Sequence, residues 1–343
     1  MCSSVGAERI ATATAGSDSD SPVGRPPLLS PVAGRREGCH KDPDATLSAG
    51  LPARPRPALK TPIDGGPPRV KTPKRASRPA APLDEAAVAG ALHEIYVPGA
   101  ETRLRSEEAQ KVREIAPLLE EVDSALRRRP ADRPLVLVDA AAGRGYVSLI
   151  SARLLLGPAG RPFRWLVIER EQRRADAVRS LAERDGFGAS FEVICADVGD
   201  PTAWPDAPDL VVALHACGPA ADAVIDRATA SSAAALLLVP CCVSKTVAAH
   251  ATAAAAAESL AIPRHAPVRR RFLESIIAAE RTLLLESRGY QTEVVEFCPP
   301  RVTPHNLLWR CRRVAEPIRA RRAADSLARL RTPRPWIEPL QDG

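Results

Sequence analysis

The chain of 343 residues is poor in aromatic side chains, which make up 3%, and it contains no apolar run long enough to cross a membrane, a length of about 18 residues. The N-terminus lacks an apolar signal segment, and its acidic residues Glu8 and Asp18 argue against a transit peptide. The eight cysteines include no C-x-x-C pair, which argues against zinc-ribbon and thioredoxin-like sites. We therefore expect a protein without membrane contact in a reduced, cytoplasmic setting.

The net charge of +7 comes almost entirely from the beginning of the chain. Residues 1–80 contain 13 Lys+Arg and 7 Asp+Glu, which gives +6, so the remainder carries only +1. Residues 1–83 also hold 14 of the 34 prolines and show no apolar period, so we predict a disordered basic tail there. A solvated tail is the favoured interpretation, and weak contact with a polyanion is the alternative. The near-neutral remainder gives no general argument for nucleic-acid binding.

The sequence changes at Asp84 to a pattern with helical spacing, and we expect Asp84 to cap the first helix. Pro117 is expected to kink or restart the second helix. From Pro134 onward, short apolar runs alternate with helical segments. The predicted regions are a tail (1–83), a helical extension (84–130), a single domain (131–315) and a C-terminal tail (316–343).

Five apolar runs separated by helical segments indicate an α/β fold with a parallel, doubly wound sheet. These runs are residues 134–140, 164–169, 191–197, 209–216 and 235–240. Two further strands, at 290–299 and 305–314, are joined by a link too short for a crossover helix, so we expect them to pair antiparallel at the edge of the sheet. The predicted sheet is therefore seven-stranded and mostly parallel, with an antiparallel last pair.

A glycine-containing turn follows the first predicted strand, with the spacing Asp139-x-Ala141-x-Gly143-x-Gly145. Glycine lets the backbone turn tightly and approach a ligand, and the next helix directs its N-terminus there. The spacing differs from the G-x-G-x-x-G of dinucleotide sites. An acidic residue at the start of the turn suits a ligand with an amino group. The alternative is a tight turn that binds nothing.

Two more carboxylates follow the next two predicted strands. Glu169 ends the second strand, where an acidic residue of a doubly wound fold can accept hydrogen bonds from ribose hydroxyls. Asp197 follows the third strand and could accept an adenine amino group, although aspartate is also a common turn residue. Three acids at one edge of the sheet together point to a nucleoside-containing ligand.

These residues resemble the class I S-adenosylmethionine-dependent methyltransferases over about residues 134–314. The resemblance implies a Rossmann-like methyltransferase fold and S-adenosylmethionine as cofactor. It implies that Asp139, Gly143 and Gly145 hold the methionine part, Glu169 the ribose and Asp197 the adenine. Ala141 stands where the family pattern has its first glycine. A methyl group is a small addition, so we expect binding to survive.

A narrower resemblance is to a branch of methyltransferase-like proteins that is similar to a tRNA acceptor-stem ribose methyltransferase. The matching positions are Gly145, Tyr146, Ser148, His215, Cys217, Gly218, Asp222 and the Pro-Cys-Cys segment 240–242. The cysteine and histidine zinc modules of the tRNA enzyme have no counterpart here. By this resemblance Tyr146 and Leu214 border the cofactor. Residues 303–306 close the substrate side, and the alternative for this segment is a plain loop between two strands.

His215 and Cys217 are the candidate catalytic residues, because they follow the fourth strand, where methyltransferases place acceptor-site residues. A neutral imidazole could take a proton from a hydroxyl or amine, or it could only shape the pocket. Cys217, Cys241 and Cys242 have three interpretations: a nucleophile toward a pyrimidine ring, metal ligands together with His215, or small packing residues. Packing is favoured, and we predict no metal site.

The predicted reaction is transfer of a methyl group to an oxygen or nitrogen atom. The acceptor could be RNA, a protein or a small molecule. Two other functions compete with this one: a nicotinamide-dependent oxidoreductase, and an RNA-binding or assembly module with a vestigial cofactor pocket. The glycine spacing and the antiparallel last pair disfavour the oxidoreductase.

Overall fold

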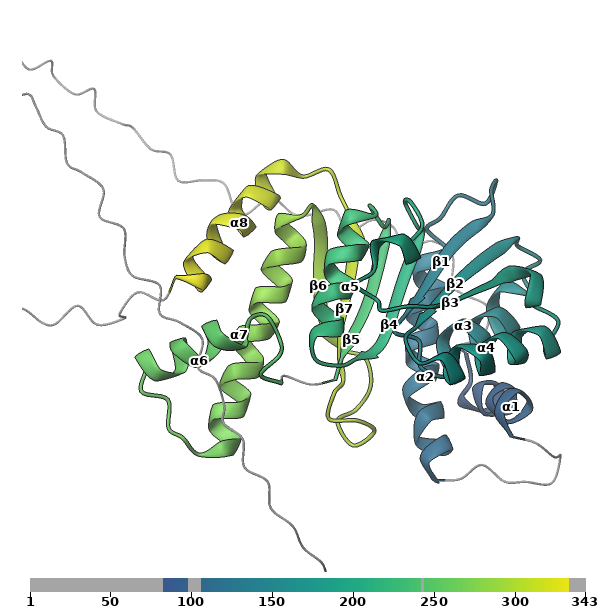
Figure 1. Ribbon diagram of the computed structural model, residues 1–343, viewed down its shortest axis with the longest axis horizontal. Coiled ribbons are helices and arrows are strands. Elements are labelled where there is room, and N and C mark those ends of the chain that lie inside the picture. Colours follow the sequence, from purple (N-terminus) through teal and green to yellow (C-terminus); the bar gives the residue numbers. More distant parts are fainter. Residues whose placement is uncertain (1–82, 98–105, 242–243, 333–343) are drawn as a thin grey trace, which may run out of the picture. The chain divides into compact units, whose positions relative to one another are not determined.

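The computed structural model describes residues 83–97, 106–241 and 244–332. The predicted tail at residues 1–83, apart from Leu83, and the proline-rich end at 333–343 lie outside these residues. Within the described part, seven strands form one sheet in the order β3-β2-β1-β4-β5-β7-β6 (Figure 1). The strands are β1 (Leu135–Ala140), β2 (Phe163–Glu169), β3 (Phe191–Cys195), β4 (Leu210–Ala216), β5 (Ala235–Pro240), β6 (Tyr290–Glu296) and β7 (Leu307–Arg313).

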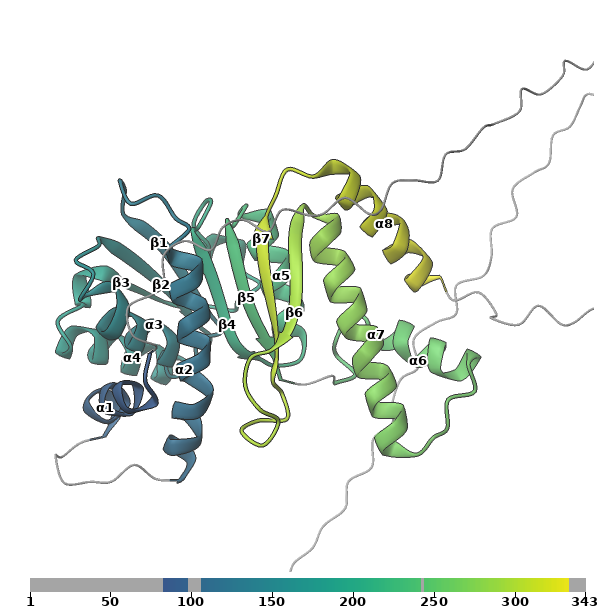
Figure 2. The same ribbon diagram turned by 180° about the vertical axis from the view of Figure 1, so that it is seen from behind.

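Helices cover both faces of this sheet (Figures 1 and 2). They are α1 (Glu85–Tyr96), α2 (Ser106–Leu126), α3 (Tyr146–Ser151), α4 (Gln172–Arg184), α5 (Pro219–Ala230), α6 (His250–Ser259), α7 (Ala266–Ser287) and α8 (Pro317–Arg331). A π-helical turn at Ala152–Leu156 extends α3.

The pairing of the strands confirms the predicted fold class. Strands β1 to β5 run parallel to one another, whereas β7 is antiparallel to both β5 and β6. The link between β6 and β7 is a short loop, which permits only an antiparallel pair. Strands β1, β2, β4 and β5 are largely buried because helices cover both sides of them, whereas the edge strand β3 is half-exposed.

The alternation of side chains along each strand divides the core into two layers. In β1, Leu137 points to the layer that holds α1, α2, α3 and α4, whereas Val138 points to the layer that holds α5 and α7. Leu137 pairs with Trp165 of β2 and Leu210 of β4, and all three are fully buried on the first face. The sheet is therefore the middle of three layers.

The carboxyl ends of β1 to β5 define one edge of the sheet, and the loop between β6 and β7 joins them there. This follows from the register, because Leu238 near the end of β5 pairs with Trp309 near the start of β7. The glycine turn after β1 and residues 297–306 therefore reach the same edge (Figure 1). Doubly wound folds bind their ligands at this edge.

The N-terminal helices agree with the sequence in one respect and differ in another. Asp84 caps α1 as predicted, since its Oδ1 accepts a hydrogen bond from the Ala86 amide at 3.1 Å. The predicted restart at Pro117 is wrong, because α2 continues through it. Ile115, Leu118 and Leu119 around the proline are fully buried. Their burial stabilises the helix by more than the ~3 kcal/mol that an internal proline costs.

The C-terminal helices form a separate part of the second layer. Helix α7 packs against α6 and α8 as well as against β6 (Figure 2). A groove of about 600 Å³ between α7 and α8 contains none of the predicted site residues. In the described part of the chain, no helix combines the length and the apolar character that crossing a bilayer requires.

Candidate cofactor and acceptor site

The turn after β1 needs left-handed backbone at three alternate positions. Ala141 has φ +54°, Gly143 +61° and Gly145 +70°. A Cβ added at Gly143 would meet no atom within 4 Å, so this glycine faces open space. A Cβ at Gly145 would lie 3.0 Å from the Val178 side chain, so Gly145 is required by packing against α4. Ala141 adopts the same conformation with a side chain, which costs about 1 kcal/mol or more.

Asp139 lies beneath this turn and holds the start of α3. Its side chain is 2% exposed, and its Oδ2 accepts hydrogen bonds from the Ser148 amide at 3.2 Å and from Ser148 Oγ at 2.7 Å. Burial raises the pKa of Asp139 from 3.8 to about 7, against the lowering effect of these hydrogen bonds. The nearby Glu169 carboxylate makes a smaller contribution to this rise. Asp139 thus fixes the turn from below.

Glu169 links the end of β2 to the glycine turn. Its Oε2 accepts a hydrogen bond from the Gly143 amide at 2.7 Å, and its Oε1 accepts one from the Glu171 amide at 3.0 Å. The residue is 5% exposed. Each carboxylate oxygen can accept a further bond, so the position remains compatible with the ribose contact that the resemblance implies.

Asp197 and Leu214 lie at the ends of the next two strands. Asp197 is exposed, and its Oδ1 accepts the Gly199 amide at 2.8 Å in a local turn. Leu214 in β4 is half-buried and packs against the core that holds α1 to α4. The structure therefore brings Asp139, Ala141, Gly143, Gly145 and Glu169 together by direct contact or in one turn. It places Asp197 and Leu214 on the same edge.

Aromatic and basic side chains cover the outer side of the turn. Tyr146 packs on Tyr96 of α1 with ring centroids 4.6 Å apart, and Tyr96 donates a hydrogen bond from its hydroxyl to the Arg144 carbonyl at 3.0 Å. The Arg144 guanidinium lies over both rings, 5.2 Å and 5.4 Å from their centroids. Helix α1, which the sequence placed only in an extension, thus holds the glycine turn in place.

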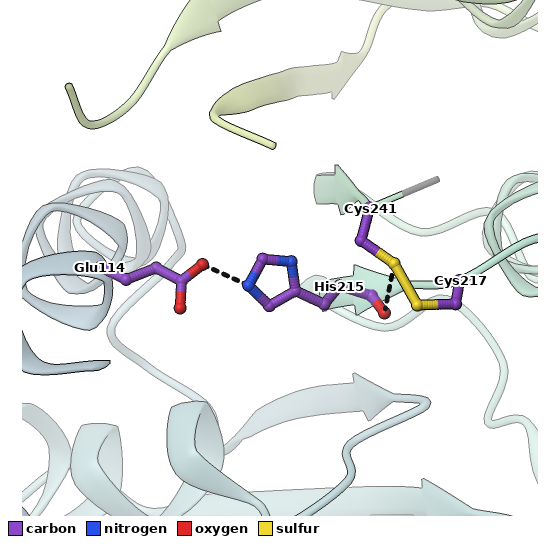
Figure 3. The surroundings of a disulfide bond; sticks show 4 residues. All are labelled: Glu114, His215, Cys217 and Cys241. Atoms are coloured by element: carbon purple, nitrogen blue, oxygen red, sulfur yellow. Dashed lines mark hydrogen bonds and ion pairs between the residues drawn. A yellow bond between two sulfur atoms is a disulfide. The ribbon is translucent and has the colours of Figure 1, made fainter. Parts of the chain in front are cut away.

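His215 lies at an irregular point of β4, near the carboxyl end of that strand. The register between β4 and β5 shifts between Leu214 and Ala216, and His215 has φ +58°. Its Nε2 contacts Oε1 of Glu114, which reaches across from α2 (Figure 3). Backbone strain of this kind is concentrated at functional sites.

Cys217 and Cys241 form a disulfide between the residues that follow β4 and β5, with their Cα atoms 5.3 Å apart (Figure 3). The interpretation of these two cysteines as separate packing residues is therefore wrong. A disulfide sulfur is not a thiolate, so the structure gives Cys217 no role as a nucleophile. Cys242 lies outside the described residues. Among the residues that the structure describes, no group of three or more His, Cys, Asp or Glu side chains could hold a metal ion.

Asp222 braces the segment that follows this disulfide. Its Oδ1 accepts a hydrogen bond from Arg281 Nε at 2.9 Å, and its Oδ2 accepts one from the Ala248 amide at 3.0 Å. Arg281 is 3% exposed and Asp222 is half-buried, so this ion pair between α5 and α7 is partly buried. The matched position Asp222 therefore has a structural role here.

The loop between β6 and β7 is held to α2. Gln110 of α2 donates a hydrogen bond from Nε2 to the Val302 carbonyl at 2.6 Å, and Asn306 donates one from Nδ2 to the Cys298 carbonyl at 2.9 Å. Burial lowers the pKa of His305, and the neighbouring charges of His215 and Arg270 lower it further. His305 thus faces the same region as His215.

Sequence reasoning missed Glu114 and Tyr96. Both lie in helices, where the residues around them follow an ordinary apolar period, so their tertiary contacts leave little local signal. Glu114 alone is weakly marked in the sequence, because it is a charged residue within the otherwise apolar, buried stripe of α2, where it is 4% exposed. A buried glutamate without a partner would be costly.

Comparison with known proteins identifies part of the chain. Residues 110–249 match the model of a family described as a methyltransferase domain. This segment contains the glycine turn, Glu169, Asp197 and the Glu114–His215 pair. A comparison with curated proteins found no significant match.

Solved structures similar to the chain include three methyltransferases. Mitomycin 7-O-methyltransferase is 16% identical, with a TM-score of 0.35, over 61% of this chain and 59% of its own length. The CMeT domain of a citrinin polyketide synthase is 14% identical, with a TM-score of 0.40, over 66% and 60%. Magnesium protoporphyrin IX methyltransferase from Synechocystis PCC 6803, with bound SAH, is 13% identical, with a TM-score of 0.40, over 67% and 99%. The chain thus spans about three fifths of the length of the first two.

The fold and the family match agree with each other. The predicted seven-stranded sheet with its antiparallel last pair is present, and the matched segment begins in α2 and ends just before α6. Residues 110–249 are accordingly similar to a methyltransferase domain, and they belong to a doubly wound α/β sheet with an antiparallel last pair.

Proposed function

We propose that the protein is an S-adenosylmethionine-dependent methyltransferase that acts on an oxygen or nitrogen atom of its acceptor. The observation that carries the proposal is the hydrogen bond from the Gly143 amide to Glu169, inside a segment that matches a methyltransferase family. It joins the glycine turn after the first strand to the carboxylate after the second, which is the pair of elements that a nucleoside ligand needs at this edge.

The residues present fit this cofactor. The position above Gly143 is open, since a Cβ there would meet no atom within 4 Å. Glu169 offers carboxylate oxygens for two ribose hydroxyls, and the exposed Asp197 offers an acceptor for an amino group. When bound, S-adenosylmethionine supplies a methyl group on a positively charged sulfur, which is a good leaving group. No binding residue of the chain has to activate it.

The chain's own residues then have separate tasks. Asp139 and Ser148 hold the turn and the first residues of α3. Glu169 fixes the backbone of the turn and would orient the ribose. His215 lies where the acceptor would approach, and its imidazole would take the proton that an acceptor hydroxyl or amine loses. Alignment of the acceptor in a pocket that excludes water would provide most of the rate enhancement.

Calorimetry on the full chain tests the cofactor. We expect S-adenosylmethionine to bind at micromolar concentration and NAD not to bind. Gly143→Asp puts a side chain and a negative charge into the open position, so its affinity should fall at least ~100-fold, which is a loss of about 2.7 kcal/mol. Gly160→Asp is the matched control, because Gly160 has the same φ of +61° and the same open surroundings but lies in a remote turn.

The outcomes separate the competing functions. Binding of NAD in place of S-adenosylmethionine would favour an oxidoreductase. Failure to bind either cofactor would refute the proposal and leave the turn as a structural element. Cofactor binding without methyl transfer to any acceptor would favour the RNA-binding or assembly module. Equal loss of affinity in Gly143→Asp and Gly160→Asp would mean that the substitutions act by disturbing the fold and not by filling the open position at Gly143.

A further inference from the structure

Glu114 is a buried acid that the proposed function does not yet use. It lies in α2, is 4% exposed, and contacts both His215 Nε2 and Lys111 Nζ. Burial, the largest influence, acts to raise the pKa of Glu114, but the hydrogen bonds from His215 and Lys111 outweigh it and lower that pKa below 4.5. Glu114 is therefore an ionised carboxylate that is itself buried, and such a group requires hydrogen-bonded partners.

His215 meets this carboxylate through one ring nitrogen and leaves the other unpaired. Its Nε2 contacts Oε1 of Glu114, and an ionised carboxylate only accepts hydrogen bonds, so this contact favours a hydrogen on Nε2. Its Nδ1 is closed to water and has no hydrogen-bond partner among the residues that the structure describes. A buried polar atom without a partner costs about 1–3 kcal/mol. This atom is therefore suited to a partner that arrives with the substrate.

We infer that Glu114 is a positioning residue for methyl transfer: it holds the Nε2–H of neutral His215 and so presents Nδ1 as the proton acceptor. This inference rests on the proposed function. The acceptor's O–H or N–H gives its proton to Nδ1 while its lone pair forms the bond to the methyl carbon. The carbon–sulfur bond breaks, and its electron pair stays on sulfur. The imidazolium that results lies against the Glu114 carboxylate, which stabilises its positive charge.

Other charged groups around the pair fit this arrangement. Lys111 holds the second oxygen of Glu114, and His305 of the loop between β6 and β7 lies near the pair, with Arg270 and Glu274 of α7 near His305. On the remaining side lies the disulfide, where Cys241 Sγ is 3.6 Å from the His215 carbonyl oxygen (Figure 3). Glu114 is the group that touches the His215 ring directly.

Nuclear magnetic resonance of the full chain with ¹⁵N-labelled histidine tests the inference without any acceptor. The chain has six histidines, and His215→Gln identifies the signal of His215. The neutral ring should carry its hydrogen on Nε2, and that hydrogen should exchange slowly with water. In Glu114→Leu, loss of the charged hydrogen bond should make this exchange ~10–100-fold faster. Glu114→Gln keeps an accepting oxygen and should retain most of the protection.

Glu121→Leu is the matched control for Glu114→Leu. Glu121 lies on the same helix and pairs with Arg310 rather than with a histidine, so this variant should leave the His215 signal unchanged. Transfer of label from methyl-tritiated S-adenosylmethionine into a whole-cell extract supplies the functional reading. It should fall ~100-fold in His215→Gln and at least ~10-fold in Glu114→Leu, with partial recovery in Glu114→Gln.

A hydrogen on Nδ1 in the wild-type protein would overturn the inference, as would unchanged exchange in Glu114→Leu. Full transfer in Glu114→Leu, with its hydrogen bond lost, would show that the pair is only structural and would overturn it as well. Absence of S-adenosylmethionine binding in the wild-type protein would instead refute the proposed function. The calorimetric experiment can thus refute the proposed function, and the resonance experiment can refute the role of Glu114, independently of each other.

Discussion

The Gly143 amide donates a hydrogen bond to the Glu169 carboxylate at 2.7 Å, across 26 positions of the sequence. A second backbone amide, that of Glu171, binds the other oxygen at 3.0 Å. The same side chain therefore shapes the glycine turn and ends β2. A single carboxylate connects the two strand ends that we assign to the cofactor.

Replacing Glu169 by Gln should weaken both the turn and cofactor binding. The amide side chain can accept only one of the two backbone hydrogen bonds, since its other end is a donor. We expect the free energy of unfolding to fall by about 1–3 kcal/mol and the affinity for S-adenosylmethionine to fall at least ~10-fold. Urea denaturation and calorimetry measure the two effects. Glu192→Gln is the control, because Glu192 pairs with Arg164 on an exposed surface; a similar effect there would contradict the prediction.

Ala141→Gly should stabilise the protein. The alanine has φ +54°, which an L-residue adopts at a cost of about 1–2 kcal/mol, whereas glycine adds some entropy to the unfolded chain. The net gain in the free energy of unfolding should be about 0.5–1 kcal/mol, with cofactor affinity unchanged. Ala142→Gly, at a neighbouring position without positive φ, should lower stability instead. Destabilisation by both variants would show that the turn is not strained at Ala141.

Asp139 should make the protein less stable as the pH rises. Its pKa is about 7 in the folded chain, against 3.8 as the ordinary value, so the folded state keeps a proton that the unfolded state releases between these values. The stabilising contribution is complete below pH 4 and is lost as the pH rises to about 7. This shift corresponds to ~4 kcal/mol. Denaturation of the wild type and Asp139→Asn at pH 5, 6.5 and 8 should show Asn gaining relative to Asp as the pH rises. Parallel curves would contradict the raised pKa.

Removal of the Cys217–Cys241 disulfide should destabilise the protein. The bond closes a loop with a sequence separation of 24, for which chain entropy predicts about 3 kcal/mol. Cys217→Ser should lower the free energy of unfolding by about this amount. A reducing agent should destabilise the wild type but leave the stability of this variant unchanged. Cys195→Ser, which changes an exposed free cysteine, should do neither. Equal stability with and without reductant would show that the bond does not form in solution.

The sequence was sufficient for the sheet and for the turn. Buried runs such as Leu135–Ala140 are fixed by local composition, and the glycine spacing is read directly. The antiparallel last pair follows from the length of its link. These features depend on neighbours in the chain, which is why they were predictable before the structure.

The acceptor side was not predictable in the same way. His215 was a candidate, but its partner Glu114 lies about 100 positions earlier, in a helix that reads as an ordinary apolar period. The disulfide depends on how the ends of β4 and β5 approach each other. Helix α6 went unpredicted because its alanine-rich stretch, residues 250–259, has little apolar period to mark it. Tertiary proximity decides the first two of these cases.

Helix α2 touches three otherwise separate parts of the site within five residues. Gln110 binds the loop between β6 and β7, Lys111 lies 5.8 Å from the Tyr146 ring centroid, and Glu114 contacts His215. Successive residues of an α-helix are rotated by about 100°. One inserted residue between Glu114 and the buried second half of α2 would turn all three side chains away together. The rotational orientation of a single helix thus sets how His215 and the loop between β6 and β7 are aligned with the glycine turn.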